Sequence, residues 1–201
     1  MPDYSFEILA AQKGYKFVCG VDEAGRGPLA GPVCAAAVIL PTDTEIEGLN
    51  DSKKISEKKR ELLFDVICEK ALAYSIAFGT LEEIEKFNIL EATFLAMNRS
   101  IEGLEIKPDY ALIDGNRVPK GITIPCETVV KGDAKSASIA AASILAKVTR
   151  DRLLLEYGNE YPEYNFKKHK GYGTKEHTDL ILKYGPCPIH RMSFLKKLLN
   201  K

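Results

Sequence analysis

Two apolar runs near the N-terminus constrain the fold of this chain more than any other feature. Phe17 to Val21 is a short run and Val33 to Leu40 is a continuous one, and a segment rich in glycine and proline lies between them. Apolar runs of this length, bounded by glycine and proline, are typical of buried β-strands. We therefore predict two buried strands joined by a tight connection.

Further helical and strand patterns follow these runs. Polar capping residues mark the starts of helices, and period-two alternation or apolar character marks strands. In chain order the patterns predict a helix from Ser56 to about Ala71, a strand over residues 72–78, a short helix after Thr80, a longer helix from Asn88 to Gly103, strands over 110–113 and 122–130, and a long helix from about Lys135 to Tyr157. This order predicts an α/β domain with a mixed central sheet flanked by helices.

The C-terminal part has a different composition. Residues 161–174 form a loop rich in aromatic residues, lysines and glycines, and two short helical pieces follow, interrupted by Gly-Pro-Cys-Pro at 185–188. We predict a main domain over residues 1–160, with residues 161–201 forming a basic loop and a small helical extension packed on it. Residues 165–201 carry nine Lys and Arg against two Asp and Glu, whereas the other 164 residues carry 19 bases and 26 acids. This asymmetry indicates a polyanionic partner bound at the basic end, and a merely solvated basic surface is the alternative.

Composition sets the class of protein. With 201 residues, of which 45% are hydrophobic, the chain can bury one sizeable core. No window approaches the roughly 18 apolar residues that span a bilayer, and the N-terminus lacks the pattern of a signal peptide. The five cysteines are odd in number and scattered, which is untypical of a disulfide framework or a zinc site. We therefore predict a cytoplasmic protein with reduced thiols and no membrane association.

Acidic side chains stand at the ends of three predicted strands. Asp22 and Glu23 come directly after the first strand, Asp114 ends another, and Asp133 comes just after a third. Charged groups at the end of a buried strand are costly unless they are paired or bind a metal, and oxygen ligands suit Mg²⁺ and Mn²⁺. The pattern therefore indicates a hard-cation site. The alternatives are an ordinary Asp-Gly turn at Asp114 and a helix cap at Asp133.

A glycine-rich loop follows the first two acids directly. Gly25, Arg26 and Gly27 open this loop, which extends to Pro32. Glycines let a backbone approach a ligand closely, with its amide groups pointing at the ligand. The loop lacks the Gly-Lys-Ser/Thr ending of a nucleotide P-loop. A plain strand-connecting turn is the alternative interpretation.

Two further segments combine cations with groups that suit nucleic acid. Residues 169–174 join cations, the Tyr172 ring and flexible backbone, a combination that suits phosphate contact and stacking on a sugar or base. Ser52 and Lys53, within Asp-Ser-Lys-Lys, place a hydroxyl beside ammonium groups. The alternatives are an ordinary surface loop around Tyr172 and an ordinary approach to the helix that follows Lys53.

The tail and the histidines complete the set of candidate groups. Phosphate contacts in the tail are expected from Arg191, Lys196, Lys197 and Lys201. The three histidines lack metal-ligand spacing, and no G-x-S-x-G motif is present. Nucleophilic catalysis by serine is therefore not indicated.

Taken together, these motifs resemble the signature segments of the bacterial type 2 ribonucleases H, the ribonuclease HII family. Residues 20–31, Gly-Val-Asp-Glu-Ala-Gly-Arg-Gly-Pro-Leu-Ala-Gly, resemble the family's opening signature. The other matching segments are Leu49 to Lys54, Leu112 to Asn116, Val130 to Asp133, Ala141 to Asp151 and His169 to Tyr172. They stand in the family's order from residue 16 to about residue 194, which is nearly the whole chain.

The resemblance implies a fold, an activity and a set of site residues. The fold would be ribonuclease H-like, with residues 1–160 as the catalytic domain. The activity would be hydrolysis of the RNA strand of RNA–DNA hybrids and cleavage 5′ to ribonucleotides embedded in or joined to DNA, leaving 3′-hydroxyl and 5′-phosphate ends. The catalytic, metal-binding acids would be Asp22, Glu23, Asp114 and Asp133, with two Mn²⁺ or Mg²⁺ ions when substrate is bound. The substrate-binding residues would be Gly25, Arg26, Gly27, Ser52, Lys53 and Tyr172, of which the glycine-rich group and the tyrosine would recognise the 2′-hydroxyl.

Some alternatives remain open within this interpretation. Asp151 also lies in a matching segment, but on a predicted helix, and we assign it a structural role. The related ribonuclease HIII would carry an extra N-terminal domain, whereas only about 16 residues precede the first strand here. A non-enzymatic hybrid-binding module would not need four acids beside a phosphate path, and a junction resolvase acting on DNA alone is the remaining rival. A monomer is the simplest expectation.

Overall fold

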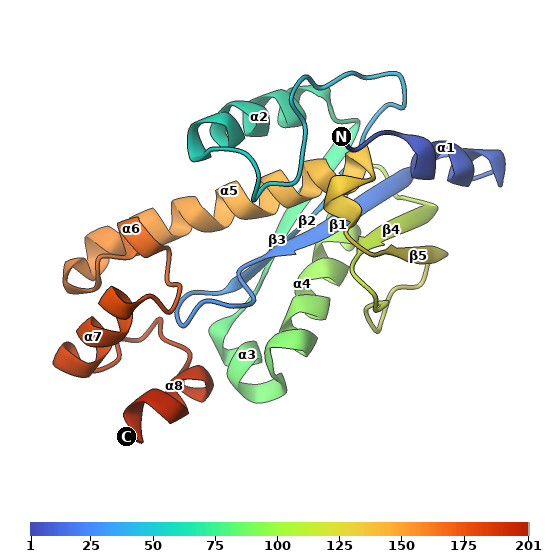
Figure 1. Cartoon of the computed structure of the whole chain (residues 1–201). Helices are drawn as coiled ribbons and strands as arrows, with labels where there is room; N and C mark the ends of the chain where they lie inside the picture. The colour runs from blue at the N-terminus through green and yellow to red at the C-terminus, as the bar shows by residue number, and fades with distance from the viewer. Residues whose placement is uncertain (201) are drawn as a thin grey trace.

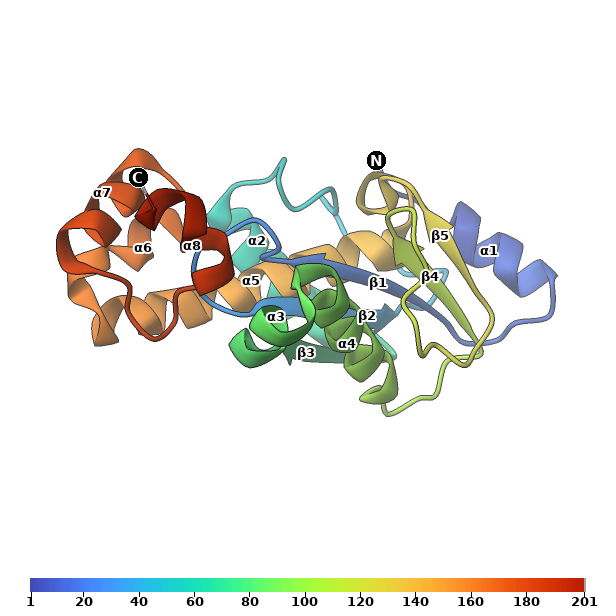
Figure 2. The same cartoon turned by 90° about the horizontal axis from the view of Figure 1, so that it is seen from below.

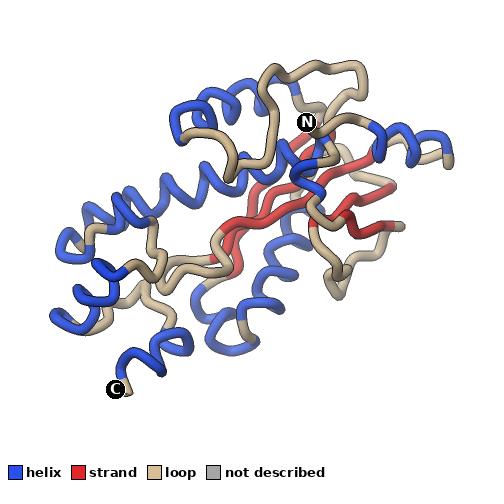
Figure 3. Tube along the Cα trace, in the orientation of Figure 1, coloured by secondary structure: helices blue, strands red, loops and turns tan. Residues whose placement is uncertain are grey.

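Residues 1–200, which the computed structural model describes, fold around a five-stranded mixed β-sheet (Figures 1 and 3). The strands are β1 (Val18–Ala24), β2 (Val33–Ile39), β3 (Ala73–Gly79), β4 (Tyr110–Asp114) and β5 (Cys126–Val129). Their order across the sheet is β3-β2-β1-β4-β5. β2 is antiparallel to both β1 and β3, whereas β4 is parallel to both β1 and β5. The predicted mixed sheet is therefore confirmed, and β1 is its central strand.

Helices cover both faces of this sheet. α5 (Ala137–Glu160) and α2 (Glu57–Lys70) lie on one face, and α3 (Leu81–Phe87) and α4 (Ile89–Glu102) lie on the other (Figure 1). The residues of β2 alternate between two apolar clusters: Cys34, Ala36 and Val38 pack with α5 and α2, and Ala35, Ala37 and Ile39 pack with α4. Burial on both faces explains why the sequence of β2 is apolar throughout.

The helix starts are where the capping residues predict them. Ser56 caps α2 by accepting a hydrogen bond from the N–H of Lys59. Thr80 and Glu83 form a reciprocal capping box at the start of α3, and the Asn88 side chain caps α4. These side chains satisfy N–H groups that have no partner within the helix, so local polar residues set the helix boundaries.

The N-terminal helix α1 (Ser5–Gln12) was not predicted. Its N-cap residue, Tyr4, makes no side-chain cap, and its apolar residues Ile8 and Leu9 are exposed. The helix therefore lacks a capping residue at the N-cap and a fully buried apolar face. Its anchor is the buried carboxylate of Glu7, which accepts hydrogen bonds from the Ser136 hydroxyl at 2.6 Å and the Ser138 N–H at 3.0 Å. This contact holds α1 against the start of α5.

Two strand ends differ from the prediction. β1 extends three residues beyond Val21 because β2 continues to pair with it, as far as Ala24 opposite Cys34. β5 begins only at Cys126 rather than at residue 122. Proline has no N–H to give to a ladder, so Pro125 marks the point where regular pairing can begin.

The C-terminal segments gather at one end of α5 (Figure 2). They are η2 (Pro162–Tyr164), α6 (Phe166–His169), α7 (Lys175–Tyr184) and α8 (Met192–Leu199). The predicted loop over residues 161–174 therefore contains two short helical turns. Tyr164, Phe166, Ile181 and Leu195 form a small apolar cluster with Ala30 and Leu154. The β1–β2 connection also reaches this end, where Ala30 forms a β-bridge with His190.

Within residues 1–200, no helix is long and apolar enough to cross a membrane. The cysteines in this part of the chain, Cys19, Cys34, Cys68, Cys126 and Cys187, are all free thiols.

Candidate active site

Asp22 and Glu23 lie within β1 rather than after it. Successive side chains of a strand point to opposite faces of the sheet. Gly20, two residues before Asp22, packs directly on α5, since a Cβ there would lie 2.2 Å from the backbone of Ser138. Asp22 therefore lies on the α5 face of the sheet. Glu23 lies on the α4 face, where it lines a pocket together with Thr93.

The end of β4 brings a third acid beside these two. The last residue pair between β1 and β4 is Val21 with Ile113, and Asp22 and Asp114 follow them in register. Neighbouring strands lie about 4.8 Å apart. Asp114 and Glu23 also line the same pocket, which has a volume of about 360 Å³. The C-terminal ends of the adjacent strands β1 and β4 thus hold three carboxylates.

The fourth acid, Asp133, reaches the site through a backbone contact. It lies in η1 (Gly132–Ala134), a 3-10 turn between β5 and α5. The backbone N–H of Gly132 donates a 2.7 Å hydrogen bond to Asp114 Oδ1. This bond attaches η1 to the end of β4, so Asp133 lies beside the other acids although it is distant from Asp22 in sequence.

Burial and like charge raise the pKa of three of these acids. The pKa of Asp22 lies well above its ordinary value because the side chain is buried, with further contributions from the charges of Glu23 and Asp114. Burial also raises the pKa of Glu23 and of Asp133, and for Asp133 the charge of Asp114 adds to the effect. Clustered carboxylates of this kind repel one another, and a bound cation removes that repulsion. The donor set and its charge therefore fit a hard divalent metal.

Each acid is engaged with a nitrogen of the protein. Asp22 Oδ1 accepts from the Glu23 N–H at 2.7 Å, and Glu23 Oε1 accepts from Arg26 Nη1 at 3.3 Å. Asp133 Oδ2 lies 3.8 Å from Lys53 Nζ. In residues 1–200, no group of three or more His, Cys, Asp or Glu side chains is arranged to hold a metal ion. The acids converge on one place, but metal coordination requires their side chains to rearrange.

Asp51 is a fifth acid beside this cluster, and the sequence interpretation gave it no role. Its negative charge contributes to the raised pKa of Asp133. Its Oδ1 accepts a 2.9 Å hydrogen bond from the N–H of Lys53. Asp51 lies in a loop before α2, so no strand end marked it in the sequence.

The glycine-rich loop lies next to Tyr172. A Cβ on Gly27 would lie 3.9 Å from Tyr172 Cε1. The N–H of Leu29 donates a 2.8 Å hydrogen bond to the carbonyl of Gly171, which ties the loop to the segment that carries the tyrosine. Gly25 has a φ of 95°, and a Cβ there would clash with a neighbouring arginine side chain, so the position requires glycine. The structure thus brings together the loop and the ring that the sequence proposed as partners.

The Tyr172 ring is available to a ligand. The residue is 41% exposed, and Lys147 Nζ lies 5.5 Å from the centroid of the ring. Arg26 and Gly27 are also exposed, whereas Gly25 is buried. An aromatic face, a guanidinium group and open backbone therefore share one surface close to the acids.

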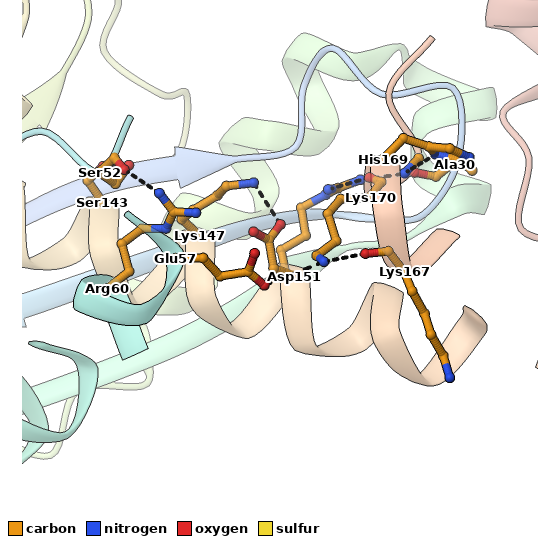
Figure 4. Close-up of polar contacts among 12 residues, drawn as sticks. Ala30, Ser52, Glu57, Arg60, Ser143, Lys147, Asp151, Lys167, His169 and Lys170 are labelled. Atoms are coloured by element: carbon orange, nitrogen blue, oxygen red, sulfur yellow. Dashed lines mark hydrogen bonds and ion pairs between the residues drawn. The ribbon is translucent and has the colours of Figure 1, made fainter. Parts of the chain in front are cut away.

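Ser52 and Lys53 point in different directions. Ser52 is buried, and its hydroxyl lies 2.8 Å from that of Ser143 in α5 (Figure 4). Its carbonyl accepts a 2.8 Å hydrogen bond from Arg60. Lys53 is exposed and reaches Asp133. In this conformation Ser52 anchors the loop, and Lys53 is the residue that faces the acids.

Asp151 lies away from the acids, on α5. Its carboxylate accepts a 2.7 Å hydrogen bond from Lys147, one helical turn earlier (Figure 4). Asp151 comes fourteen positions after Ala137, the first residue of the helix, which corresponds to about 20 Å along the axis. Its partner and its place fit the structural role assigned from the sequence.

Arg191 is not a surface residue, which corrects the expectation that it contacts phosphate. Its guanidinium is fully buried and donates to backbone carbonyls of the glycine-rich loop. Lys196 and Lys197 are exposed on α8, and Lys201 lies outside the described residues. The charge composition of the segment does not distinguish a buried arginine from exposed lysines, so Arg191 was grouped with the lysines in the prediction.

Comparisons with known proteins give the family of this chain. A family model described as ribonuclease HII matches residues 19–197. The ribonuclease HII of Endomicrobium trichonymphae is 58% identical over 191 residues, which are 95% of this chain and 91% of that relative. Both comparisons extend over nearly the whole chain.

Solved structures have the same fold. The ribonuclease H2 of Pyrococcus horikoshii OT3 superposes with a TM-score of 0.77 at 28% identity, covering 92% of this chain and 98% of that one. Bst-RNase HIII in complex with Mn²⁺ superposes with a TM-score of 0.72 at 17% identity, covering 96% of this chain and 72% of that one, and this second likeness concerns the fold alone. The ribonuclease H-like fold is therefore confirmed, and the chain belongs to the ribonuclease HII family of ribonuclease H-type endonucleases.

Proposed function

We propose that the chain hydrolyses the RNA strand of RNA–DNA hybrids and cuts 5′ to ribonucleotides embedded in or joined to DNA, leaving 3′-hydroxyl and 5′-phosphate ends. One observation carries this proposal: four carboxylates converge at the end of β4, and an exposed tyrosine and a glycine-rich loop lie together near them. The acids suit the chemistry at a phosphate, and the loop with the ring suits recognition of the adjacent sugar.

The four acids would hold the metal ions. Asp22 and Asp114 lie side by side on adjacent strands, with Glu23 on one side of the sheet and Asp133 on the turn attached to Asp114. When bound, two divalent cations supply activation of the attacking water and stabilisation of the leaving 3′-oxygen. The carboxylates provide the negative charge that keeps such cations beside an anionic backbone. Lys53 would give up its contact with Asp133 and turn to the substrate phosphate.

Mn²⁺ or Mg²⁺ is the proposed cofactor. Both ions prefer oxygen ligands, and all four proposed ligands are carboxylates. The solved ribonuclease HIII structure with this fold is itself a complex with Mn²⁺. Two ions would be bound in the presence of substrate.

Gly25, Arg26, Gly27 and Tyr172 would recognise the ribonucleotide. The 2′-hydroxyl is the group that distinguishes RNA from DNA at one position, and it can both donate and accept hydrogen bonds. The exposed Tyr172 ring can pack on the sugar, and the exposed backbone near Gly27 can bond the hydroxyl. Because these contacts involve the sugar and 2′-hydroxyl of one nucleotide, they permit cleavage at a single ribonucleotide in a DNA duplex.

The C-terminal residues 161–201 are proposed as an extension packed on the catalytic domain of residues 1–160. The exposed lysines of α8 would contact backbone phosphates. Tyr172 lies within this extension, so the extension also contributes to the site itself.

One assay tests the proposed function. A DNA duplex with a single embedded ribonucleotide is incubated with the protein, with and without Mg²⁺ or Mn²⁺, and an all-DNA duplex of the same sequence serves as the control. We expect metal-dependent cleavage at the 5′ side of the ribonucleotide, with 3′-hydroxyl and 5′-phosphate ends, and no cleavage of the control. Cleavage of the all-DNA duplex would support the resolvase alternative, and binding without cleavage would support a hybrid-binding module.

A further inference from the structure

Arg191 shapes the glycine-rich loop from inside the protein. Its Nε donates to the carbonyl of Gly31 at 2.8 Å, and its Nη1 donates to those of Arg26 at 3.0 Å and Pro28 at 2.8 Å. Its Nη2 donates to the carbonyl of Gly25 at 2.6 Å. One guanidinium thus holds four carbonyls of the β1–β2 connection, although Arg191 is about 160 residues away in sequence.

This inward arrangement of carbonyls dictates where the amides point. A trans peptide is planar, so its C=O and the N–H of the next residue point in opposite directions. With the carbonyls of Gly25 and Arg26 directed at Arg191, the N–H groups of Arg26 and Gly27 point away from the protein interior. No backbone carbonyl within residues 1–200 accepts from either N–H. Arg191 therefore leaves two adjacent amides free on the surface beside Tyr172.

Arg150 supports the other half of the loop from α5. It donates to the carbonyls of Ala30 at 2.9 Å and Pro32 at 3.1 Å, and to that of Lys170 at 3.1 Å. Its side chain occupies the space that a Cβ on Gly25 would need. Two buried guanidinium groups therefore fix the backbone conformation of the loop. The loop's carbonyl oxygens in turn supply the hydrogen bonds that the buried guanidinium groups require.

His190, the neighbour of Arg191, connects to Tyr172 through a second histidine. The backbone N–H of Cys187 can only donate, so His190 Nδ1 accepts at 2.9 Å and the ring carries its proton on Nε2. His190 Nε2 lies 3.0 Å from His177 Nε2, which must accept. His177 Nδ1 then donates to the carbonyl of Tyr172 at 2.9 Å. These donors and acceptors thus form one series of hydrogen bonds with a single direction, which ends at the backbone carbonyl of the tyrosine.

The environment keeps the two histidine rings of this hydrogen-bond series neutral. His177 and His190 are buried, and burial lowers the pKa of each ring to about 4. His169 stacks on His177 with centroids 4.2 Å apart, and burial lowers its pKa as well. The Cys187 thiol lies 3.0 Å from His190 Nδ1. A proton added to either ring of the His190–His177 pair would place two N–H groups face to face, so only the neutral state gives the observed chain.

We propose that His190 and Arg191 are positioning residues for ribonucleotide recognition: Arg191 presents the amides of Arg26 and Gly27, and His190 holds Tyr172 through His177. This inference rests on the proposed function. The two residues are consecutive, so one short segment after the Gly-Pro-Cys-Pro turn sets both recognition elements. The C-terminal extension is therefore part of the recognition site and not only a basic surface.

The Arg191 contact is tested with Arg191→Lys and a control variant in the same segment. Lysine keeps the charge but presents its donors from a single nitrogen, so it cannot hold four carbonyls. Leu195→Ala is the control, because Leu195 is buried in the C-terminal apolar cluster and its side chain has no donor for the loop's carbonyls. We expect Arg191→Lys to lower kcat on a single embedded ribonucleotide by about a hundredfold, as a misplacement of roughly 1 Å does. Affinity for the duplex should change by less than about threefold, since phosphate contacts supply it. Leu195→Ala should lower the melting temperature while keeping kcat within about threefold of wild type.

The His190 contact is tested by a double-mutant cycle with Tyr172. In His190→Asn, the side-chain oxygen can still accept from Cys187, but the shorter amide ends before the Nε2 position, so the hydrogen bond to His177 is lost. We expect His190→Asn to lower kcat by about tenfold in the wild-type background and to have no further effect on kcat in Tyr172→Ala. Equal effects in both backgrounds would mean that His190 acts on stability and not through Tyr172. This double-mutant cycle remains a test of the proposal even if Arg191→Lys does not fold.

The wild-type protein separates this inference from the proposed function. If wild type fails to cleave the embedded ribonucleotide, the proposed function is wrong. If wild type cleaves it and Arg191→Lys loses no more kcat than Leu195→Ala, the positioning role of Arg191 is overturned while the proposed function stands.

Discussion

Asp114, at the end of β4, accepts a 2.7 Å hydrogen bond from the backbone N–H of Gly132. Because Gly132 precedes Asp133, this bond couples the positions of two proposed metal ligands that come from separate segments. It also leaves Asp114 with a defined orientation before any cation binds. The geometry of the acid cluster therefore depends on backbone placement as well as on the acids themselves.

Gly132→Ala should disturb this coupling. A Cβ at Gly132 would lie 2.6 Å from Ile139 Cδ1 and 3.2 Å from Asp114 Oδ1, and Ile139 is fully buried. The turn should shift and carry Asp133 with it, and a shift of about 1 Å can cost on the order of a hundredfold in rate. Single-turnover cleavage of an embedded ribonucleotide checks this expectation. An unchanged rate for Gly132→Ala would contradict the coupling.

Asp22→Asn should stabilise the metal-free protein at neutral pH. The raised pKa of Asp22 means that its ionised form is costly in the folded state. This cost is present at neutral pH and disappears as pH falls below the folded-state pKa toward the unfolded value of about 3.9, because the folded protein then binds the extra proton. The melting temperature of the variant in EDTA should therefore exceed that of wild type at pH 7.5, and the difference should shrink toward pH 4. A variant that is less stable at pH 7.5 would show that repulsion among the acids is not the dominant effect.

Tyr172→Ala should lose activity far more than affinity. The exposed ring lies beside Gly27, where it can position the sugar next to the scissile phosphate, and such misplacements cost rate steeply. Phosphate contacts elsewhere supply most of the affinity. Turnover on the embedded ribonucleotide, affinity for the duplex and melting temperature are measured on the same variant. Normal turnover would leave the tyrosine without a role in 2′-hydroxyl recognition, and lower stability with unchanged turnover would identify it as a packing residue.

Much of this site follows from sequence because it depends on local signals. Apolar runs located β1 and β2, and acids near strand ends pointed to Asp22, Glu23, Asp114 and Asp133. Caps such as Ser56 located the helix starts. These signals each involve only a few neighbouring residues, so they can be recognised in the amino-acid sequence.

Other features could not be predicted because they depend on distant partners. Pairing with β2 extends β1 through Asp22 and Glu23, and the anchor of α1 is a contact between Glu7 and Ser136. Ser52 is predicted to bind substrate, and the contact between its hydroxyl and that of Ser143, more than 90 residues away, could not be predicted. Arg191 looked like part of a basic tail. Burial reverses the expected role of a polar residue, and burial is set by tertiary packing.

Neutralising the exposed lysines of the tail should reduce the salt dependence of binding. Lys196 and Lys197 lie on α8 and are exposed, unlike Arg191. Lys196→Gln combined with Lys197→Gln should reduce the slope of log affinity against log salt by about 0.9 for each phosphate that the variant no longer neutralises. Titration of a hybrid duplex over a range of salt measures the slope, and kcat at saturating substrate should stay close to wild type. An unchanged slope would show that α8 does not contact the nucleic acid. Deleting the chain after Lys183 is a poorer test, because it also removes Arg191 from the glycine-rich loop.

The role of the acids as metal ligands is tested most directly by metal titrations of cleavage with Asp22→Asn, Asp114→Asn and the control Asp151→Asn. The control removes a buried acid that pairs with Lys147 on α5. We expect Asp22→Asn and Asp114→Asn to remain folded and to lose at least about a thousandfold in turnover at saturating Mg²⁺ or Mn²⁺, since several kcal/mol of transition-state stabilisation is lost. Asp151→Asn should keep turnover within about tenfold of wild type, consistent with a structural role. Near-wild-type turnover by either Asp22→Asn or Asp114→Asn at saturating metal would contradict the assignment of the acid cluster as the metal site.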